Sequence, residues 1–415
     1  MTAETILSKR PFVHGIEPIE KITWQKIDAV HRALLEHEEE KFGVLDGRAG
    51  MALFFARHYK LTGNADSLDA VQKLVDSCID HLSGTDFSYS FCSGFMGIAW
   101  AIHHLADQNL IEHPDEATWC DIDQAVADFT LAELNQGMYD FLHGGLGGVP
   151  YLLARHPHGG SEKTLVSIVE ALATLADRDE QGFRWKDYRT RIKAFDYRDE
   201  PIYNLGLAHG IPSIISLLSM IYRKGIARKK IKELIDRSVD WLLQQKNKPA
   251  GAVSVFPTYI STQGSKISPA SRLGWCYGDL GIAVALNHAG CALNNEKYKD
   301  LASRILLHTR MSRTCENGFI EDASLCHGSM GVSHIYRTMY RTSGHAWLRH
   351  EADRWLHTTL DKASDTTAPA GFNYLVQDGY VTRYNLIEGL AGIGLALMGA
   401  VNPKDTSWDR SFLLS

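Results

Sequence analysis

The sequence predicts an all-α protein with an α/α toroid fold, a double ring of about seven inner and seven outer helices. A short glycine motif recurs seven times along the chain, and amphipathic helical patterns lie between its copies. The chain holds no comparable set of alternating strand patterns. We expect a single domain over residues 1–415, with an N-terminal segment at 1–20 and a loop insertion at 249–270 near the mouth of a central cavity.

The glycine motif predicts the inner helices. Each copy has an apolar residue or cysteine, a polar residue, Gly, two further residues, usually a second Gly, and then an apolar run. The first glycines of the copies are Gly47, Gly94, Gly144, Gly210, Gly278, Gly328 and Gly389. The fourth copy departs from the pattern, because Ser213 replaces the second glycine. An apolar helix of this kind must be buried on most sides.

Amphipathic segments between the motifs predict the outer helices. Their apolar residues recur at i, i+3, i+4 and i+7, as in Asp66–Leu82, Thr164–Glu180, Lys230–Lys246 and Trp347–Ala363. An open solenoid is the alternative arrangement, but it needs polar capping repeats at its ends. The first and last motifs are as apolar as the middle ones, which favours a closed ring.

A polar residue precedes the first glycine in every copy of the motif. These residues are Asp46, Ser93, His143, His209, Tyr277, His327 and Glu388. Packing alone does not explain them, because a buried polar group without a partner costs free energy. We therefore expect a polar central cavity at one end of the toroid, with the active site inside it.

Composition excludes several functional classes. The chain has 43 basic and 49 acidic residues and a formal net charge of −6, without a long basic run, so a nucleic-acid partner is not expected. The apolar stretches are shorter than the ~18–20 residues of a spanning helix, and the start of the chain lacks a signal-peptide pattern, so we expect a cytoplasmic protein. Seven cysteines, an odd number, argue against a disulfide framework.

Cys276, Cys326 and His327 form a candidate metal site. A Cys2His set is typical of catalytic zinc, with the fourth position left for water or substrate. Adjacent ligands diverge by about 100° in a helix, so Cys326 and His327 need a turn, which Gly328 can supply. Cys92 holds the same motif position in the second repeat, and we predict that it is not a ligand. A buried core role for such cysteines is the alternative.

The segments GLAHG (206–210), WCYG (275–278) and CHG (326–328) resemble the lanthipeptide cyclase, or LanC-like, family, in particular its stand-alone bacterial class I cyclases. The motifs occur in the family's order, and the repeats that carry them cover nearly the whole chain. The resemblance implies an α/α toroid, one catalytic zinc per chain held by Cys276, Cys326 and His327, and cyclisation of a ribosomal peptide.

The resemblance also assigns roles to further residues. His209 matches the family's proposed acid/base histidine, Asp140 its active-site aspartate, Arg272 its active-site arginine, and Tyr277 the tyrosine of WCYG. Structural alternatives remain: core packing for His209 and Tyr277, capping of the inner helix near Gly144 by Asp140, and a structural role for Arg272. His143 departs from relatives that have an acid there, which adds a second candidate proton donor.

The implied reaction is an intramolecular conjugate addition. A cysteine thiol of a dehydrated precursor peptide adds to dehydroalanine or dehydrobutyrine and forms a lanthionine or methyllanthionine ring. Expected partners are that peptide, a separate dehydratase and, as a further candidate, a membrane transporter complex that the cyclase would accompany peripherally. Two rival functions remain open: a toroidal glycoside hydrolase using Asp140, Asp46 and Glu388, and a non-catalytic binding scaffold with a structural zinc.

Overall fold

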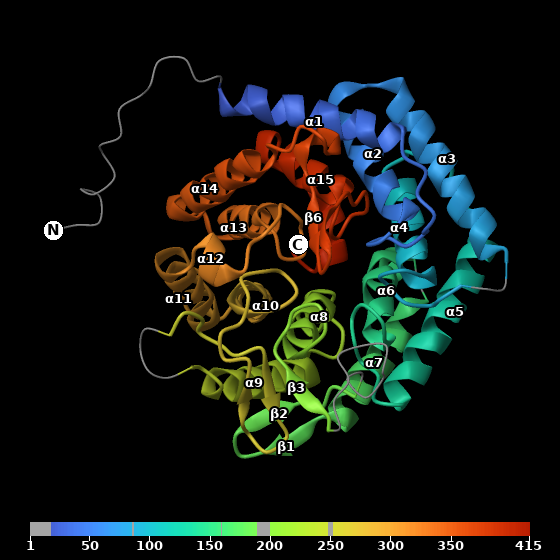
Figure 1. Ribbon diagram of the computed structural model, residues 1–415. Coiled ribbons are helices and arrows are strands. Elements are labelled where there is room, and N and C mark those ends of the chain that lie inside the picture. The colour runs from blue at the N-terminus through green and yellow to red at the C-terminus, as the bar shows by residue number, and fades with distance from the viewer. Residues whose placement is uncertain (1–17, 85–86, 159, 189–199, 248–251) are drawn as a thin grey trace.

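A computed structural model describes residues 18–84, 87–158, 160–188, 200–247 and 252–415. Within these ranges the chain forms the predicted double ring of helices (Figure 1). The inner ring consists of α2 (Arg48–Thr62), α4 (Phe95–Asp107), α6 (Val149–Arg155), α8 (Ile211–Arg223), α10 (Asp279–Leu293), α13 (Ser329–Ser343) and α15 (Leu390–Val401). The outer ring consists of α1 (Ile19–Leu35), α3 (Ala65–Leu82), α5 (Glu116–Asn135), α7 (Ser161–Leu175), α9 (Arg228–Gln244), α11 (Glu296–Ser312) and α14 (Ala346–Lys362).

Every inner helix begins directly after the first glycine of its motif. In the third repeat the helix starts as a short 3-10 turn, η2 (Gly145–Gly148), that continues into α6. Glycine is required most clearly at Gly278, where φ is +95° and an added Cβ would lie 2.2 Å from the carbonyl oxygen of Arg272. The motif therefore marks the point where a tight turn enters a buried helix.

Among the described residues, backbone hydrogen bonds join six of the seven neighbouring pairs of turns that precede the inner helices, and we call this set of bonds the loop belt. The turns of the third and fourth repeats are joined by the side chains of Asp140 and His209. The loop belt runs from Leu45 N–H to Cys92 O (3.0 Å), Cys92 to Leu142 (3.0 Å), Ala208 to Cys276 (3.3 Å), Trp275 to Cys326 (2.7 Å), Cys326 to Ile387 (3.0 Å) and Ile387 to Leu45 (2.9 Å). The last bond joins the seventh repeat to the first. The ring is therefore closed, as the apolar end repeats predict, and is not an open solenoid.

Short strands, which the sequence patterns did not predict, lie in the connections between helices. β1 (Asp177–Asp179) pairs with β2 (Gly182–Arg184), and β6 (Tyr374–Val376) pairs with β7 (Gly379–Val381). β4 (Tyr259–Ser261) pairs with β3 (Ile202–Asn204) and β5 (Lys266–Ile267). The helix expected to reach Glu180 stops at Leu175, because the next residues join β1.

The two segments set apart in the sequence are described only in part. Residues 1–17 of the N-terminal segment and 249–251 of the loop insertion lie outside the described residues. The remainder of the insertion contains β4 and β5, which pair as a hairpin. No described helix combines the length and the apolar character needed to span a membrane.

The C-terminal segment lies at the middle of the ring (Figure 1). Its 3-10 helix η6 (Ser407–Phe412) buries Trp408 and Phe412, and Leu413 is also fully buried. The indole Nε1–H of Trp275 donates a hydrogen bond to the carbonyl oxygen of Phe412 at 2.7 Å. This contact supports, from inside the ring, the turn that carries Cys276.

Candidate active site

The seven polar residues that precede the first glycines occupy equivalent positions. Each is half-buried, whereas the glycine that follows it is buried. Neighbours along the ring make contact: the Ser93 hydroxyl donates to Asp46 Oδ2 at 2.9 Å, and the rings of His143 and His209 stack with centroids 5.9 Å apart. The structure thus gathers these side chains at the same end of the ring.

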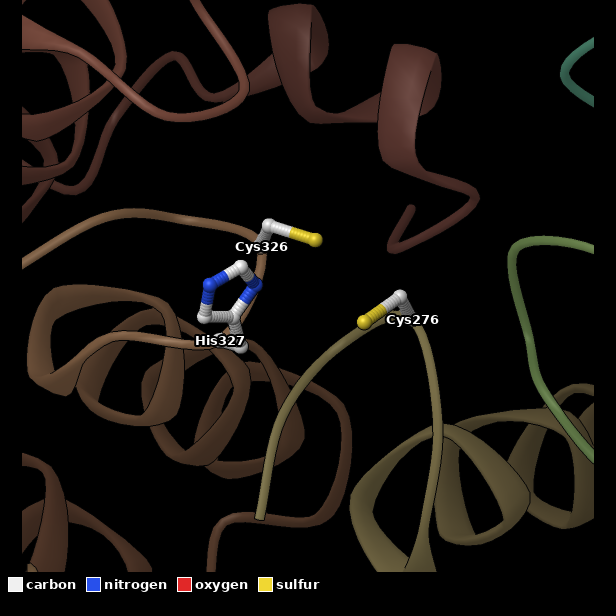
Figure 2. Close-up of side chains that lie close together, drawn as sticks. All are labelled: Cys276, Cys326 and His327. Carbon is white, nitrogen blue, oxygen red and sulfur yellow. The ribbon is translucent and has the colours of Figure 1, made fainter. Parts of the chain in front are cut away.

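Cys276, Cys326 and His327 converge on one point. Cys276 lies in the turn before α10, and the other two residues lie in the turn before α13, so the loop belt aligns them through the bond from Trp275 N–H to Cys326 O. Their potential ligand atoms all lie within 4.8 Å of one another. Figure 2 shows the two sulfur atoms and one ring nitrogen turned toward one another.

The imidazole of His327 is suited to a metal ligand. Its Nδ1 is buried and has no hydrogen-bond partner, while its Nε2 lies 3.3 Å from the hydroxyl of Tyr374. A buried nitrogen without a partner is costly, and a metal ion between it and two sulfurs would satisfy it. The three residues therefore fit zinc by donor type, by convergence and by the unpaired nitrogen.

The two cysteines of this cluster differ in acidity. A hydrogen bond from Cys326 to the Cys276 sulfur, helped by His327 and by the positive charge of Arg272, holds the pKa of Cys276 well below its usual range. The same bond, together with burial, raises the pKa of Cys326. By contrast, burial raises the pKa of Cys92 to about 12, and Cys92 is not among the clustered residues. Thiolate character thus belongs to the cluster and not to the motif position.

Asp140 and His209 form a second feature of the site. The His209 Nδ1 lies 2.8 Å from Asp140 Oδ2, and Asp140 Oδ1 accepts the backbone N–H groups of Leu142 (2.9 Å) and His143 (2.8 Å). Asp140 therefore stabilises its own turn and also holds the imidazole of His209. It does not cap the inner helix, because its two backbone partners precede the helical segment that begins at Gly145. The ion pair of Asp140 and His209 joins the third repeat to the fourth.

His143 and Tyr277 lie beside this pair, and Arg272 lies near the cysteine cluster. Ligand atoms of Asp140, His143 and His209 all lie within 4.8 Å of one another. The Tyr277 ring lies 5.7 Å from the His209 ring. Arg272 is half-buried, and its charge acts on the cysteine cluster. The structure thus brings all the predicted site residues to one end of the toroid.

Two tyrosines at this end were not singled out by sequence reasoning. Tyr374 of β6 donates its hydroxyl hydrogen to Glu388 Oε1 at 2.9 Å and contacts His327. Tyr259 of β4 packs against Tyr277 with ring centroids 5.5 Å apart. No local sequence pattern indicates that β6 and β4 bring these two side chains to the site.

Comparisons with known proteins agree with this geometry. The sequence model of the family described as lanthionine synthetase C-like protein matches residues 38–413. The nisin biosynthesis protein NisC of Lactococcus lactis subsp. lactis is 24% identical over 292 residues, which cover 66% of this chain and 68% of NisC. A solved structure of nisin cyclase superposes with a TM-score of 0.71 and 18% identity, covering 95% of this chain and 96% of that one. This similarity shows the toroidal fold.

Proposed function

Since the chain belongs to the lanthionine synthetase C-like family and is a cyclase of that type, we propose that it closes lanthionine and methyllanthionine rings with a zinc ion. The proposed ligands are Cys276, Cys326 and His327. The observation that carries the proposal is the convergence of two sulfurs and an unpaired buried nitrogen at the end of the ring that also holds His209.

The reaction joins a thiol and an alkene within one dehydrated peptide. The peptide sulfur forms a C–S bond to the β-carbon, the alkene electron pair moves to the carbonyl as an enolate, and the α-carbon then takes up a proton. A free thiol is mostly protonated at pH 7. Zinc, when bound, would supply a Lewis acid that favours the thiolate form of the substrate.

The residues around the cluster would handle the enolate and the proton. His209 is the proposed proton donor, because its Nδ1 is held by Asp140 and an imidazole can act as a general acid. Arg272 stays charged and would stabilise the negative charge of the enolate. Tyr277, beside His209, would add a hydroxyl to the same environment. His143 stacks on His209 and is the competing donor.

The rival functions have less support. A glycoside hydrolase needs a pair of available carboxyl groups, but Asp140 is engaged at both oxygens and Glu388 accepts from Tyr374. Asp46 accepts from Ser93 at Oδ2 and keeps Oδ1 unpaired, so it supplies one available carboxyl oxygen without a second group to pair with it. A structural zinc site is usually closed by four protein ligands. The cluster comprises three among the described residues, which supports a site open to substrate.

Zinc content and cyclisation test the proposal together. We expect about one zinc per chain, lost in Cys276→Ala and retained in Cys92→Ala, which removes a cysteine from the same motif position. Ring closure consumes the free thiols of a dehydrated peptide, and mass spectrometry after alkylation measures how many remain. The thiols should persist with Cys276→Ala and should be consumed with Cys92→Ala. Zinc retained without Cys276, or a metal-free protein with full activity, would contradict the proposal.

We further propose that a separate dehydratase supplies the substrate, because the reaction consumes residues that are already dehydrated. A cytoplasmic location beside a membrane transporter complex is part of the same proposal. Co-purification of the three components from cells that express them together tests it. Recovery of the cyclase alone under conditions that preserve a dehydratase–transporter pair would contradict it.

A further inference from the structure

We propose that Tyr374 is a positioning residue of the metal centre. Its hydroxyl holds His327 at Nε2, so that Nδ1 faces the two cysteine sulfurs. Glu388, in turn, holds Tyr374. The inference rests on the proposed function in one respect, namely that a metal ion binds at Cys276 and Cys326.

The hydrogen-bond directions support this assignment. A phenol has one O–H donor, and Tyr374 lies 2.9 Å from Glu388 Oε1, which can only accept when ionised. The Tyr374 oxygen is therefore left to accept from His327 Nε2 at 3.3 Å. The proton of the neutral imidazole is then placed on Nε2, and the lone pair is placed on the buried Nδ1. That tautomer is the one a metal ligand at Nδ1 requires.

The ring arrangement agrees with this direction of bonding. The centroids of His327 and Tyr374 lie 5.6 Å apart with an interplanar angle of 58°, so the rings are tilted and not stacked. In Figure 2 the second ring nitrogen of His327 points away from both sulfur atoms. The tyrosine hydroxyl thus acts on the side of the imidazole opposite the cysteine cluster.

Further hydrogen bonds hold Glu388 and the strand that carries Tyr374 in place. Asn385 Oδ1 accepts the backbone N–H of Glu388 at 2.8 Å, and Asn373, next to Tyr374, donates to Asp365 Oδ2 at 2.7 Å. The loop belt adds a second link, because Cys326 N–H donates to Ile387 O at 3.0 Å. The seventh repeat therefore reaches the metal-binding turn through its backbone and through the Glu388–Tyr374 pair.

Outer hydrogen bonds of this kind orient metal-binding histidines, and their loss typically weakens metal affinity by about 10- to 100-fold. Tyr374→Phe removes the hydroxyl and keeps the ring, so it separates hydrogen bonding from packing of the hairpin. Tyr380→Phe is a matched control, since Tyr380 lies on β7 of the same hairpin and is 57% exposed.

The test is a zinc-affinity measurement by competition with a chromophoric chelator. We expect Tyr374→Phe to bind zinc about 10- to 100-fold more weakly, with the melting temperature of the metal-free protein unchanged, while Tyr380→Phe binds as the unmodified protein does. In the cobalt(II)-substituted protein, the visible absorption bands should shift in Tyr374→Phe alone, because His327 is held differently.

The outcomes separate this inference from the proposed function. If the unmodified protein binds no zinc, the proposed metal centre fails, and the positioning role fails with it. If the unmodified protein binds zinc and Cys276→Ala loses it, but Tyr374→Phe keeps full affinity and an unchanged cobalt spectrum, the positioning role is refuted and the metal centre stands.

Discussion

Replacing Asp140 by Asn tests the proposed proton donor without disturbing the metal ligands. Asn keeps a carbonyl oxygen for the backbone N–H groups of Leu142 and His143, but it removes the negative charge 2.8 Å from His209 Nδ1. A hydrogen bond to a charged group contributes about 1.5–3 kcal/mol. If this stabilises the protonated imidazole that gives up its proton, kcat falls about 10- to 100-fold.

The assay is the rate of ring closure in a dehydrated peptide at saturating substrate, with zinc content measured on the same samples. We expect Asp140→Asn to keep its zinc and its melting temperature and to lose rate. Asp140→Ala should lose rate and also stability, because it removes the acceptor for two backbone N–H groups. An Asp140→Asn rate equal to that of the unmodified protein would refute the pairing as a catalytic feature. Comparing His209→Gln with His143→Gln then identifies the donor as the histidine whose loss lowers kcat more.

Two further predictions concern stability and the metal-binding turn. Burial lowers the pKa of His58 and His288 from 6.5 to about 4, so the unfolded chain binds more protons between these values. The free energy of unfolding in urea should therefore fall from pH 7 to pH 5, by on the order of 2 kcal/mol for each of these histidines. A rise would contradict this. Gly206→Ala would place a Cβ 2.5 Å from the carbonyl oxygen of Cys276. We expect it to cost about 1–3 kcal/mol of stability and to weaken zinc binding, and an unchanged melting temperature and affinity would contradict this.

The inner ring could be predicted because its signal is local and repeated. Each motif combines a turn glycine with an apolar run, so the start of α2 or α10 can be located from a few residues. The outer ring was predicted as a whole, although the patterns of α1, α5 and α11 were not singled out. β1 and β6 escaped prediction because three residues are too few for an alternating pattern.

In the candidate site, too, local patterns could be predicted and contacts between distant segments could not. The residues of one turn, such as Cys326 and His327, are neighbours in sequence, and the repeat pattern places Cys276 beside them. Tyr374 could not be placed in this way, because its contacts with His327 and Glu388 depend on how a hairpin folds back over the ring. Likewise, the resemblance assigned a role to Asp140, but only the structure shows that its two oxygens serve different partners.

Closure of the ring affects how the chain can fold as it is synthesised. The carbonyl oxygen of Leu45 accepts hydrogen bonds from the N–H groups of Leu386 and Ile387. The Leu45 carbonyl and the side of α2 that packs against α15 therefore lack their partners until nearly the whole chain has been synthesised. Contacts between such distant segments slow folding, and apolar surface exposed meanwhile promotes aggregation. The ring of this protein can thus close only at the end of synthesis, and until then the first repeat keeps one apolar side without its partner.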